Sequence, residues 1–240
     1  MNVLNPSGRL PLVGDVAGFD CTVEEGGWPW AEENAEAIAA HWKAAVERKP
    51  SMFNGRVLIA TEIGIEYSRL SAVCTPVDYA ALNFWKNCGF PPADAFNLFG
   101  AGVVVSSDGA VLMGEMAAHT ANAGQIYFPC GTPDTGDVVD GRLDLEHSLR
   151  RELEEEAGLG EGHLVPADAR WMVRDGPLFC CARRFDSPLG ARDLADLVEA
   201  HRAAQKQPEL GRVLLVRDLD ELPAGQVPAF ALALAAQVLD

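Results

Sequence analysis

The 240-residue sequence lacks any run of about 18 apolar residues, so it predicts no membrane-spanning helix. Its first residues lack the basic segment followed by an apolar segment that marks a secretory signal, so we expect a cytoplasmic protein. Basic residues are few: 19 Lys and Arg stand against 35 Asp and Glu, and the formal net charge is −16. This charge repels nucleic-acid backbones and anionic membrane surfaces, so neither is expected as a partner.

The six cysteines include no C-x-x-C pair, which excludes the usual zinc ribbons and thioredoxin-like sites. No G-x-S-x-G sequence is present, so the nucleophile elbow of the α/β-hydrolases is absent as well. Cys180 and Cys181 are adjacent within an apolar run and are expected to point to opposite faces of a strand. Free thiols in a reducing compartment are the simplest interpretation.

Helix and strand patterns are mixed along the chain without strict alternation, which predicts an α+β fold rather than a barrel. We expect an N-terminal subdomain over residues 1–95 and a second domain over residues 96–240. Helices are predicted at residues 31–48, 78–86, 145–157, 191–204 and 227–239. Strands are predicted at residues 56–62, 67–74, 100–106, 110–115, 126–128, 169–173, 177–184 and 212–216, and a polar loop at residues 132–143.

Three carboxylates stand out on the helix predicted at residues 145–157. Glu152, Glu155 and Glu156 are spaced i, i+3 and i+4, so they share one helix face. Carboxylates crowded in this way repel one another unless a cation lies between them, and their hard oxygen ligands suit Mg²⁺ or Mn²⁺. The plainer interpretation is a solvated acidic face with ordinary i,i+4 ion pairs such as Arg151 with Glu155.

The string from Arg151 to Leu159 reads R-E-L-E-E-E-A-G-L. It fits R-E-U-x-E-E-x-G-U, the second half of the Nudix box, in which U is a bulky aliphatic residue. The chain thus resembles the Nudix hydrolases. The resemblance implies an α/β/α sandwich with a mixed sheet over residues 96–240, carrying an N-terminal α/β extension. It also implies Mg²⁺ (or Mn²⁺) held by Glu152, Glu155 and Glu156, an orienting role for Arg151, and attack by water on a nucleoside diphosphate linked to another group.

The first half of the box is irregular. In the family pattern G-x5-E-x7-R, seven residues separate the Glu from the Arg, whereas thirteen separate Asp137 from Arg151 here, which indicates an insertion of about six residues. Asp137, Asp140 and Asp144 are therefore all candidates for the loop carboxylate, and Asp144 is preferred as the helix N-cap. The preceding Phe-Pro-Cys-Gly resembles the family's F-P-G-G, with Cys130 as a packing substitute for Gly.

Family members often draw a general base or an extra ligand from outside the box. Glu209 follows Gln207 and Pro208 and precedes the strand predicted at residues 212–216, which matches one such placement. Glu209 competes with Glu152 for the role of base, because a base must reach the attacking water. An ordinary surface acid is the alternative interpretation of Glu209.

The N-terminal part carries a looser resemblance. Trp42 and residues 49–55, followed by two strands, resemble the front of the Nudix branch that acts on UDP-glucose and UDP-galactose. This resemblance implies hydrolysis of a UDP-sugar to UMP and a sugar 1-phosphate. ADP-ribose-like and other nucleoside diphosphate derivatives stay open, and Trp42 and Phe53 could be plain core residues. A second copy of the chain is a candidate partner through an apolar N-terminal strand.

Two further classes of function compete with the enzyme. One is a catalytically weak Nudix-fold protein that binds or senses a nucleotide or nucleotide sugar, which the displaced loop carboxylate allows. The other is an acidic interaction protein whose Glu cluster is solvated.

Overall fold

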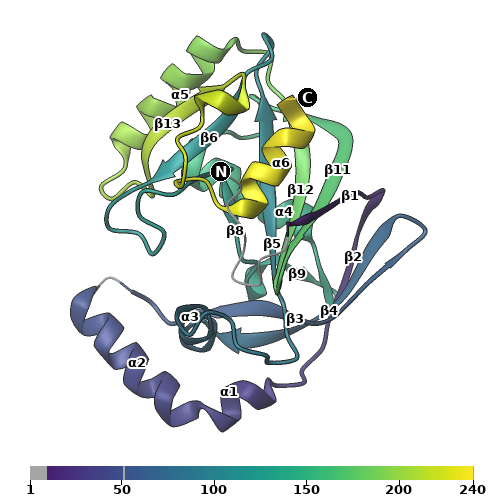
Figure 1. Ribbon diagram of the computed structural model, residues 1–240, viewed down its shortest axis with the longest axis vertical. Helices are drawn as coiled ribbons and strands as arrows, with labels where there is room; N and C mark the ends of the chain where they lie inside the picture. Colours follow the sequence, from purple (N-terminus) through teal and green to yellow (C-terminus); the bar gives the residue numbers. More distant parts are fainter. Residues whose placement is uncertain (1–9, 51, 240) are drawn as a thin grey trace.

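The structure is a computed structural model that describes residues 10–50 and 52–239. Its larger sheet has the strand order β1-β11-β12-β5-β6-β13, with β7 paired to β6 and β8 paired to β5 (Figure 1). These strands are β1 (Leu12–Asp15), β5 (Asn97–Val105), β6 (Val111–Met116), β7 (Ile126–Tyr127), β8 (Cys130–Gly131), β11 (Val165–Asp175), β12 (Leu178–Asp186) and β13 (Leu210–Val216). The β12–β5 pair is parallel, so the sheet is mixed.

The smaller sheet has the order β3-β4-β2-β10-β9. Its strands are β2 (Gly18–Val23), β3 (Arg56–Glu66), β4 (Arg69–Asp78), β9 (Val138–Val139) and β10 (Arg142–Leu143). The helices are α1 (Pro29–Glu33), α2 (Ala35–Arg48), α3 (Tyr79–Asn87), α4 (Leu145–Ala157), α5 (Ala191–Ala204) and α6 (Ala229–Leu239), with short 3₁₀ turns η1 (Thr135–Asp137) and η2 (Leu219–Glu221). The expected α+β class is confirmed.

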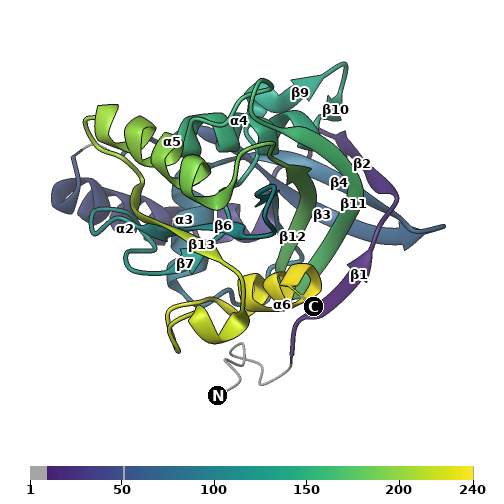
Figure 2. The same ribbon diagram turned by 90° about the horizontal axis from the view of Figure 1, so that it is seen from above.

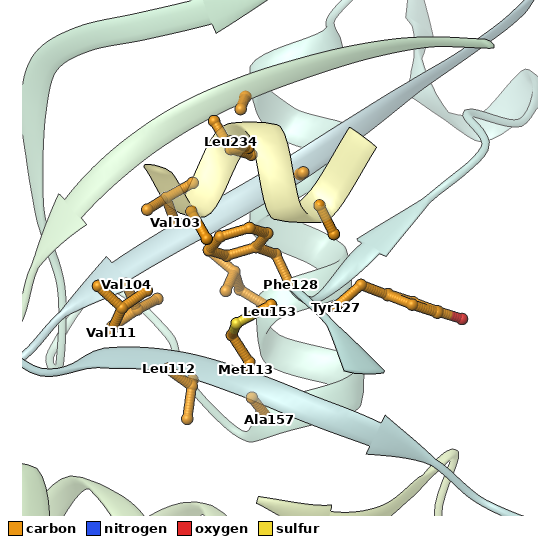
Figure 3. Close-up of a cluster of buried hydrophobic side chains, with 14 of the residues drawn as sticks. Val103, Val104, Val111, Leu112, Met113, Tyr127, Phe128, Leu153, Ala157 and Leu234 are labelled. Carbon is orange, nitrogen blue, oxygen red and sulfur yellow. The ribbon is translucent and has the colours of Figure 1, made fainter. Parts of the chain in front are cut away.

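Strand β5 is covered by a helix on each face. Built Cβ atoms on Gly100 and Gly102 would meet Leu149 and Leu153 of α4, so these positions face α4. The alternate residue Phe99 faces the other way and packs edge-on against Phe230 of α6, with ring centroids 5.2 Å apart. Figure 3 shows the resulting core, in which side chains from β5, α4 and α6 meet. The expected α/β/α sandwich is therefore present around the larger sheet.

The two sheets exchange strands between the halves of the chain. Strand β1 pairs antiparallel with β11 at the edge of the larger sheet, although it comes from the first residues that the structure describes. Strand β10, from the polar segment before α4, pairs with β2 of the smaller sheet. Figure 2 shows β1 beside β11, and β9 and β10 close to β2. The boundary expected at residue 95 stays a prediction, and each sheet contains strands from both sides of it.

The N-terminal part differs from expectation in detail. The Gly- and Pro-rich segment before residue 30, for which no strand was predicted, forms β1 and β2. Helix α1 begins at Pro29, because the missing N–H of proline is not needed in the first helical turn. The helix predicted at residues 31–48 is broken at Asn34 into α1 and α2. Strand β3 continues through Gly64 to Glu66, and the chain turns into β4 at Tyr67 and Ser68, which both have positive φ.

The cysteines agree with expectation. All six are free, and Cys180 and Cys181 contribute to different apolar clusters on the two faces of β12.

No helix in the described part of the chain combines the length and apolar composition needed to cross a membrane. Strand β3 is an edge strand, and Ile65 and Tyr67 at its exposed end are 49% and 97% exposed. Pairing of this edge with a second copy stays a prediction.

The close approach of α4 to β5 can be tested at Gly102. A built Cβ at this position lies 2.5 Å from Leu153, which is fully buried and has no room to move. We expect Gly102→Ala to lower the free energy of unfolding by about 1–3 kcal/mol, which corresponds to roughly 2–4 °C in Tm per kcal/mol. Gly14→Ala in β1 is the matched control, because nothing lies within 4 Å of its built Cβ. Equal Tm values for both variants would contradict the packing described here.

Candidate active site

The segment Leu145–Ala157 forms the predicted helix, α4, with its predicted ends. The Asp144 side chain caps it by accepting a hydrogen bond from the His147 N–H at 2.9 Å, and Gly158 ends it with φ of 70°. The stripe of Leu149, Leu153 and Ala157 is fully buried. This burial orients the opposite face, which carries the glutamates, toward β8 and the loops around it.

Glu156 is the most unusual of the three glutamates. It is only 5% exposed, and its Oε2 atom has no hydrogen-bond partner in the described part of the chain. Burial raises the pKa of this carboxyl well above its usual value, and the charges of Glu152 and Glu209 raise it further. A backbone hydrogen bond from Cys130 opposes the shift. A buried carboxylate oxygen without a partner is costly, so this atom is suited to receive a cation.

Glu152 lies against β8. A built Cβ on Gly131 would lie 2.3 Å from the Glu152 carboxyl carbon, so only glycine leaves room for this side chain. Burial raises the pKa of Glu152 to about 7; the charge of Arg151 opposes this shift, and the charges of Glu155 and Glu209 add to it. The Gly that opens the box pattern therefore provides the space in which the carboxylate is held.

Arg151 holds three carboxylates at once. Its Nη2 donates to Asp137 Oδ2 at 3.0 Å, and its Nη1 lies 3.0 Å from Glu152 Oε1 and 3.2 Å from Glu155 Oε2. Its Nε also donates to Asp137 Oδ1 at 3.3 Å, so the contact with Asp137 is bidentate. The guanidinium thus contacts all three carboxylates, and the orienting role that the resemblance implies for Arg151 stays a prediction.

Among the three candidates for the loop carboxylate, Asp137 is the residue that reaches Arg151. It is 1% exposed and also accepts a hydrogen bond from the Asp134 N–H at 3.0 Å, as part of a capping box in η1. Asp144 is the N-cap of α4, as preferred, and Asp140 lies in a turn. Asp137 therefore occupies the position that the first Glu of the box has in sequence.

The residues inserted relative to the box pattern form a hairpin whose two ends lie close together. Residues 138–143, expected to be part of a polar loop, form the hairpin β9–β10, whose turn residues Asp140 and Gly141 have φ of 50° and 74°. Positive φ at both positions is the pattern of a type I′ turn, which Asp-Gly favours. At the base of the hairpin, the Asp144 N–H donates to the Asp137 carbonyl at 2.9 Å. The six extra residues are thereby bypassed in space, and seven residues separate Asp137 from Arg151 once the hairpin is set aside.

Glu209 lies in the loop before β13 and is exposed. Its charge raises the pKa of both Glu152 and Glu156, so the structure brings it into the same electrostatic neighbourhood. Its backbone carbonyl accepts a hydrogen bond from the Ala117 N–H at 2.8 Å, which fixes the loop to the end of β6. Whether it acts as base or ligand stays a prediction.

The glutamates form an acidic neighbourhood rather than a closed metal cage. No three carboxylate, imidazole or thiolate groups within residues 10–50 and 52–239 lie together closely enough to hold a metal ion. Among the three glutamates of α4, Glu155 leaves the ligand set open, because its carboxylate turns toward Arg151 and its side chain is 61% exposed. Glu152 and Glu156 nevertheless fit Mg²⁺ or Mn²⁺, because they supply hard oxygen ligands and one of these oxygens is buried without a partner.

Gly131 offers a direct test of the site's geometry. An alanine methyl would overlap the Glu152 carboxyl group, so Gly131→Ala should displace this carboxylate. We expect a loss of Mg²⁺-dependent stabilisation in thermal unfolding and a fall in any Mg²⁺-dependent activity of about tenfold to a hundredfold. Gly162→Ala is the control, because nothing lies within 4 Å of its built Cβ. A Gly131→Ala protein with an unchanged response to Mg²⁺ would refute the placement of Glu152.

The raised pKa of Glu152 predicts a pH-dependent stability of the metal-free protein. A carboxyl group with a higher pKa in the folded than in the unfolded state stabilises the fold below about pH 4.5, and this contribution is lost as the pH rises through about 7. In EDTA, Glu152→Gln should therefore gain stability relative to wild type between these values, by up to about 3 kcal/mol. Urea unfolding across this pH range measures the difference. Parallel curves for the two proteins would contradict the prediction.

The chain is similar to several solved structures. No family model matches the sequence, and no curated protein matches it. Among solved structures, the chain is similar to the MutT protein of Methanosarcina mazei, with 19% identity, a TM-score of 0.39 and coverage of 60% of this chain and 92% of that one. It is similar to RenU, a Nudix hydrolase of M. smegmatis, with 17% identity, a TM-score of 0.39 and coverage of 60% and 86%.

A third likeness is to the NUDIX domain of NrtR from Shewanella oneidensis, determined in complex with ADP ribose. The identity is 18% and the TM-score 0.39, and the alignment covers 59% of this chain and 85% of that one. By the residues of its box helix, the chain resembles the Nudix hydrolases.

Proposed function

We propose that this chain is a Mg²⁺-dependent (or Mn²⁺-dependent) Nudix-type pyrophosphohydrolase that cleaves a nucleoside diphosphate linked to another group. The observation that carries the proposal is the buried carboxylate of Glu156, whose Oε2 has no partner in the described residues while Glu152 lies close enough to raise its pKa. An acidic helix that only served solubility would expose these groups to water. Burial of two neighbouring carboxylates instead favours a bound cation.

The residues divide into supporting and reacting groups. Glu152, Glu155 and Glu156 supply the oxygen ligands, and Glu155 can join the other two by turning away from Arg151. Arg151 keeps Glu152 in place while it is itself held by the buried Asp137. Bound Mg²⁺ would neutralise charge on the phosphates and activate a water for attack. Glu152 and Glu209 are the two candidates for accepting the proton of that water.

A UDP-sugar is the finer proposal for the substrate, with UMP and a sugar 1-phosphate as products. Two aromatic residues, Trp42 and Phe53, belong to the sequence resemblance on which this proposal depends. Trp42 packs edge-on against Tyr79, with ring centroids 6.0 Å apart, as a structural residue would. Phe53 is 82% exposed and is therefore not a core residue. It borders a cavity of about 440 Å³ with Arg56, Tyr79 and Asp134. An exposed aromatic ring beside the segment that carries Asp137 supports stacking with a nucleobase.

A protein that binds a nucleotide without turnover is the second candidate. The exposed, Arg151-bound position of Glu155 favours it, because it leaves the ligand set incomplete in the described residues. Turnover separates the two functions, whereas metal binding alone does not. The expected cytoplasmic location and the absence of nucleic-acid and membrane partners stay predictions.

The proposed activity is tested by incubating the protein with Mg²⁺ and a panel of UDP-sugars, ADP-ribose and other nucleoside diphosphate derivatives. The products UMP, AMP and inorganic phosphate are then measured. We expect Glu155→Gln and Glu156→Gln each to reduce turnover at least tenfold, because each removes a charged ligand, with folding retained by circular dichroism.

Glu154→Gln is the matched control, since Glu154 belongs to the same helix but is exposed and makes no ion pair with a described residue. Equal activity of wild type, Glu155→Gln and Glu156→Gln would refute the assignment of Glu155 and Glu156 as metal ligands. Metal-dependent nucleotide binding without release of any product would favour the binding protein instead.

A further inference from the structure

Lys86 connects the N-terminal part of the chain to the region of the glutamates. It lies in the last turn of α3, and its Nζ donates a hydrogen bond to Asn122 Oδ1 at 2.8 Å. Asn122 belongs to the loop between β6 and β7, which lies beside α3 in both ribbon views (Figures 1 and 2). The lysine therefore reaches from one half of the chain to the other.

The hydrogen-bond chain continues toward the site. The Asn122 Nδ2 donates to the Tyr127 hydroxyl at 2.9 Å. The ring of Tyr127 is anchored in the apolar core, whereas its hydroxyl points away from that cluster (Figure 3). Burial raises the pKa of Tyr127, and the charges of Glu156 and Glu209 contribute to the shift, so these carboxylates lie in its neighbourhood. Asn122 is thus held between Tyr127 and the ammonium group.

The Cys130 thiol marks the space between Lys86 and the glutamates. Burial raises the pKa of this thiol, the charges of Glu156 and Glu152 raise it further, and the charge of Lys86 lowers it. The three charges therefore act at the same point, next to the β8 residue that hydrogen-bonds Glu156. Lys86 is exposed, yet the protein around it desolvates its ammonium and lowers its pKa.

Lys86 differs from Arg151 in having donors to spare. Among residues 10–50 and 52–239, no carboxylate lies within ion-pair distance of it, and the neutral Asn122 amide is its hydrogen-bond partner. Arg151 is already shared among three carboxylates, and Arg212 after the Glu209 loop pairs with Glu115. An ammonium group has three N–H donors, of which one is used here.

The charge of the site makes such a cation necessary for a diphosphate. Asp137, Glu152 and Glu155 share a single guanidinium, and Glu156 and Glu209 add further acidic groups near Glu152, so the uncompensated charge repels phosphate groups. Mg²⁺ offsets part of this repulsion on the side of the glutamates. A second cation facing the same space can bind the phosphate oxygens that the metal does not contact.

We propose that Lys86 is a substrate-binding residue whose ammonium, positioned by Asn122, binds a phosphate oxygen of a diphosphate that is also held near Glu152 and Glu156. This inference rests on the proposed function, because it assumes a diphosphate in that space. It gives the N-terminal part of the chain a direct role in the site, and it identifies a contact with the diphosphate that is common to all the nucleotides in the substrate panel.

The test uses the full chain with saturating Mg²⁺ and methylenediphosphonate, a non-hydrolysable diphosphate. Its binding is measured by isothermal titration calorimetry to wild type, Lys86→Met, Lys86→Arg and the control Lys43→Met, a lysine exposed on α2. Loss of one charge-assisted hydrogen bond should weaken binding to Lys86→Met about tenfold, while Lys86→Arg retains most of the affinity and Lys43→Met all of it. With a substrate, Lys86→Met should raise KM more than it lowers kcat.

The rise in Tm that Mg²⁺ alone causes serves as the second measurement and should be the same in wild type and Lys86→Met. A Lys86→Met protein that binds methylenediphosphonate as tightly as wild type overturns the inference. So does a variant in which the response to Mg²⁺ changes while the diphosphonate affinity does not, since that marks a mere counter-ion of the glutamates. If wild type itself neither binds methylenediphosphonate nor hydrolyses any substrate, the proposed function is overturned together with the inference. This outcome is seen with wild type alone, so it is distinguishable from failure of the Lys86 inference.

Discussion

The close packing of α4 on β5 is the constraint on which the rest of the site depends. Gly100 and Gly102 have no side chains, so Leu149 and Leu153 can approach the strand directly. Gly100 is also paired with Gly131 of β8, whose missing side chain leaves the space that Glu152 fills. Each glycine therefore brings the helix closer, and the apolar burial on one face carries the carboxylates of the other face into the protein interior.

The burial of Glu152 and Glu156 is electrostatically unfavourable for their carboxylates. Two carboxylates are held where water solvates them poorly, and the described residues offer Arg151 as the main compensation. Arg151 is in turn kept in place by Asp137, which also accepts a hydrogen bond from the Asp134 N–H at η1. Under the proposed function, a divalent cation would relieve this unfavourable charge arrangement, so affinity for the cation and stability of the metal-free protein are expected to change in opposite directions.

The sequence predicts what depends on local pattern. The cap at Asp144 and the bounds of the helix at residues 145–157 follow from local pattern, and both are confirmed. The hairpin at residues 138–143 was missed, although Asp140-Gly141 is a dipeptide that favours hairpin turns. Its strands have two residues each and are formed because β2 offers them an edge, which no local pattern reveals. Lys86 was missed for the same reason, because its place in the site arises from contacts between α3 and the loop after β6.

The pairing of β1 with β11 has a consequence for synthesis of the protein on the ribosome. The first strand has no partner until residues 165–175 have been made, which at about 5–20 residues per second takes on the order of ten seconds or more. Strand β2 likewise waits for β10 to complete the smaller sheet. The nascent chain therefore carries open strand edges through most of translation: the smaller sheet can be completed once β10 has been made, whereas the larger sheet must wait until β11, β12 and β13, which follow α4, have been synthesised.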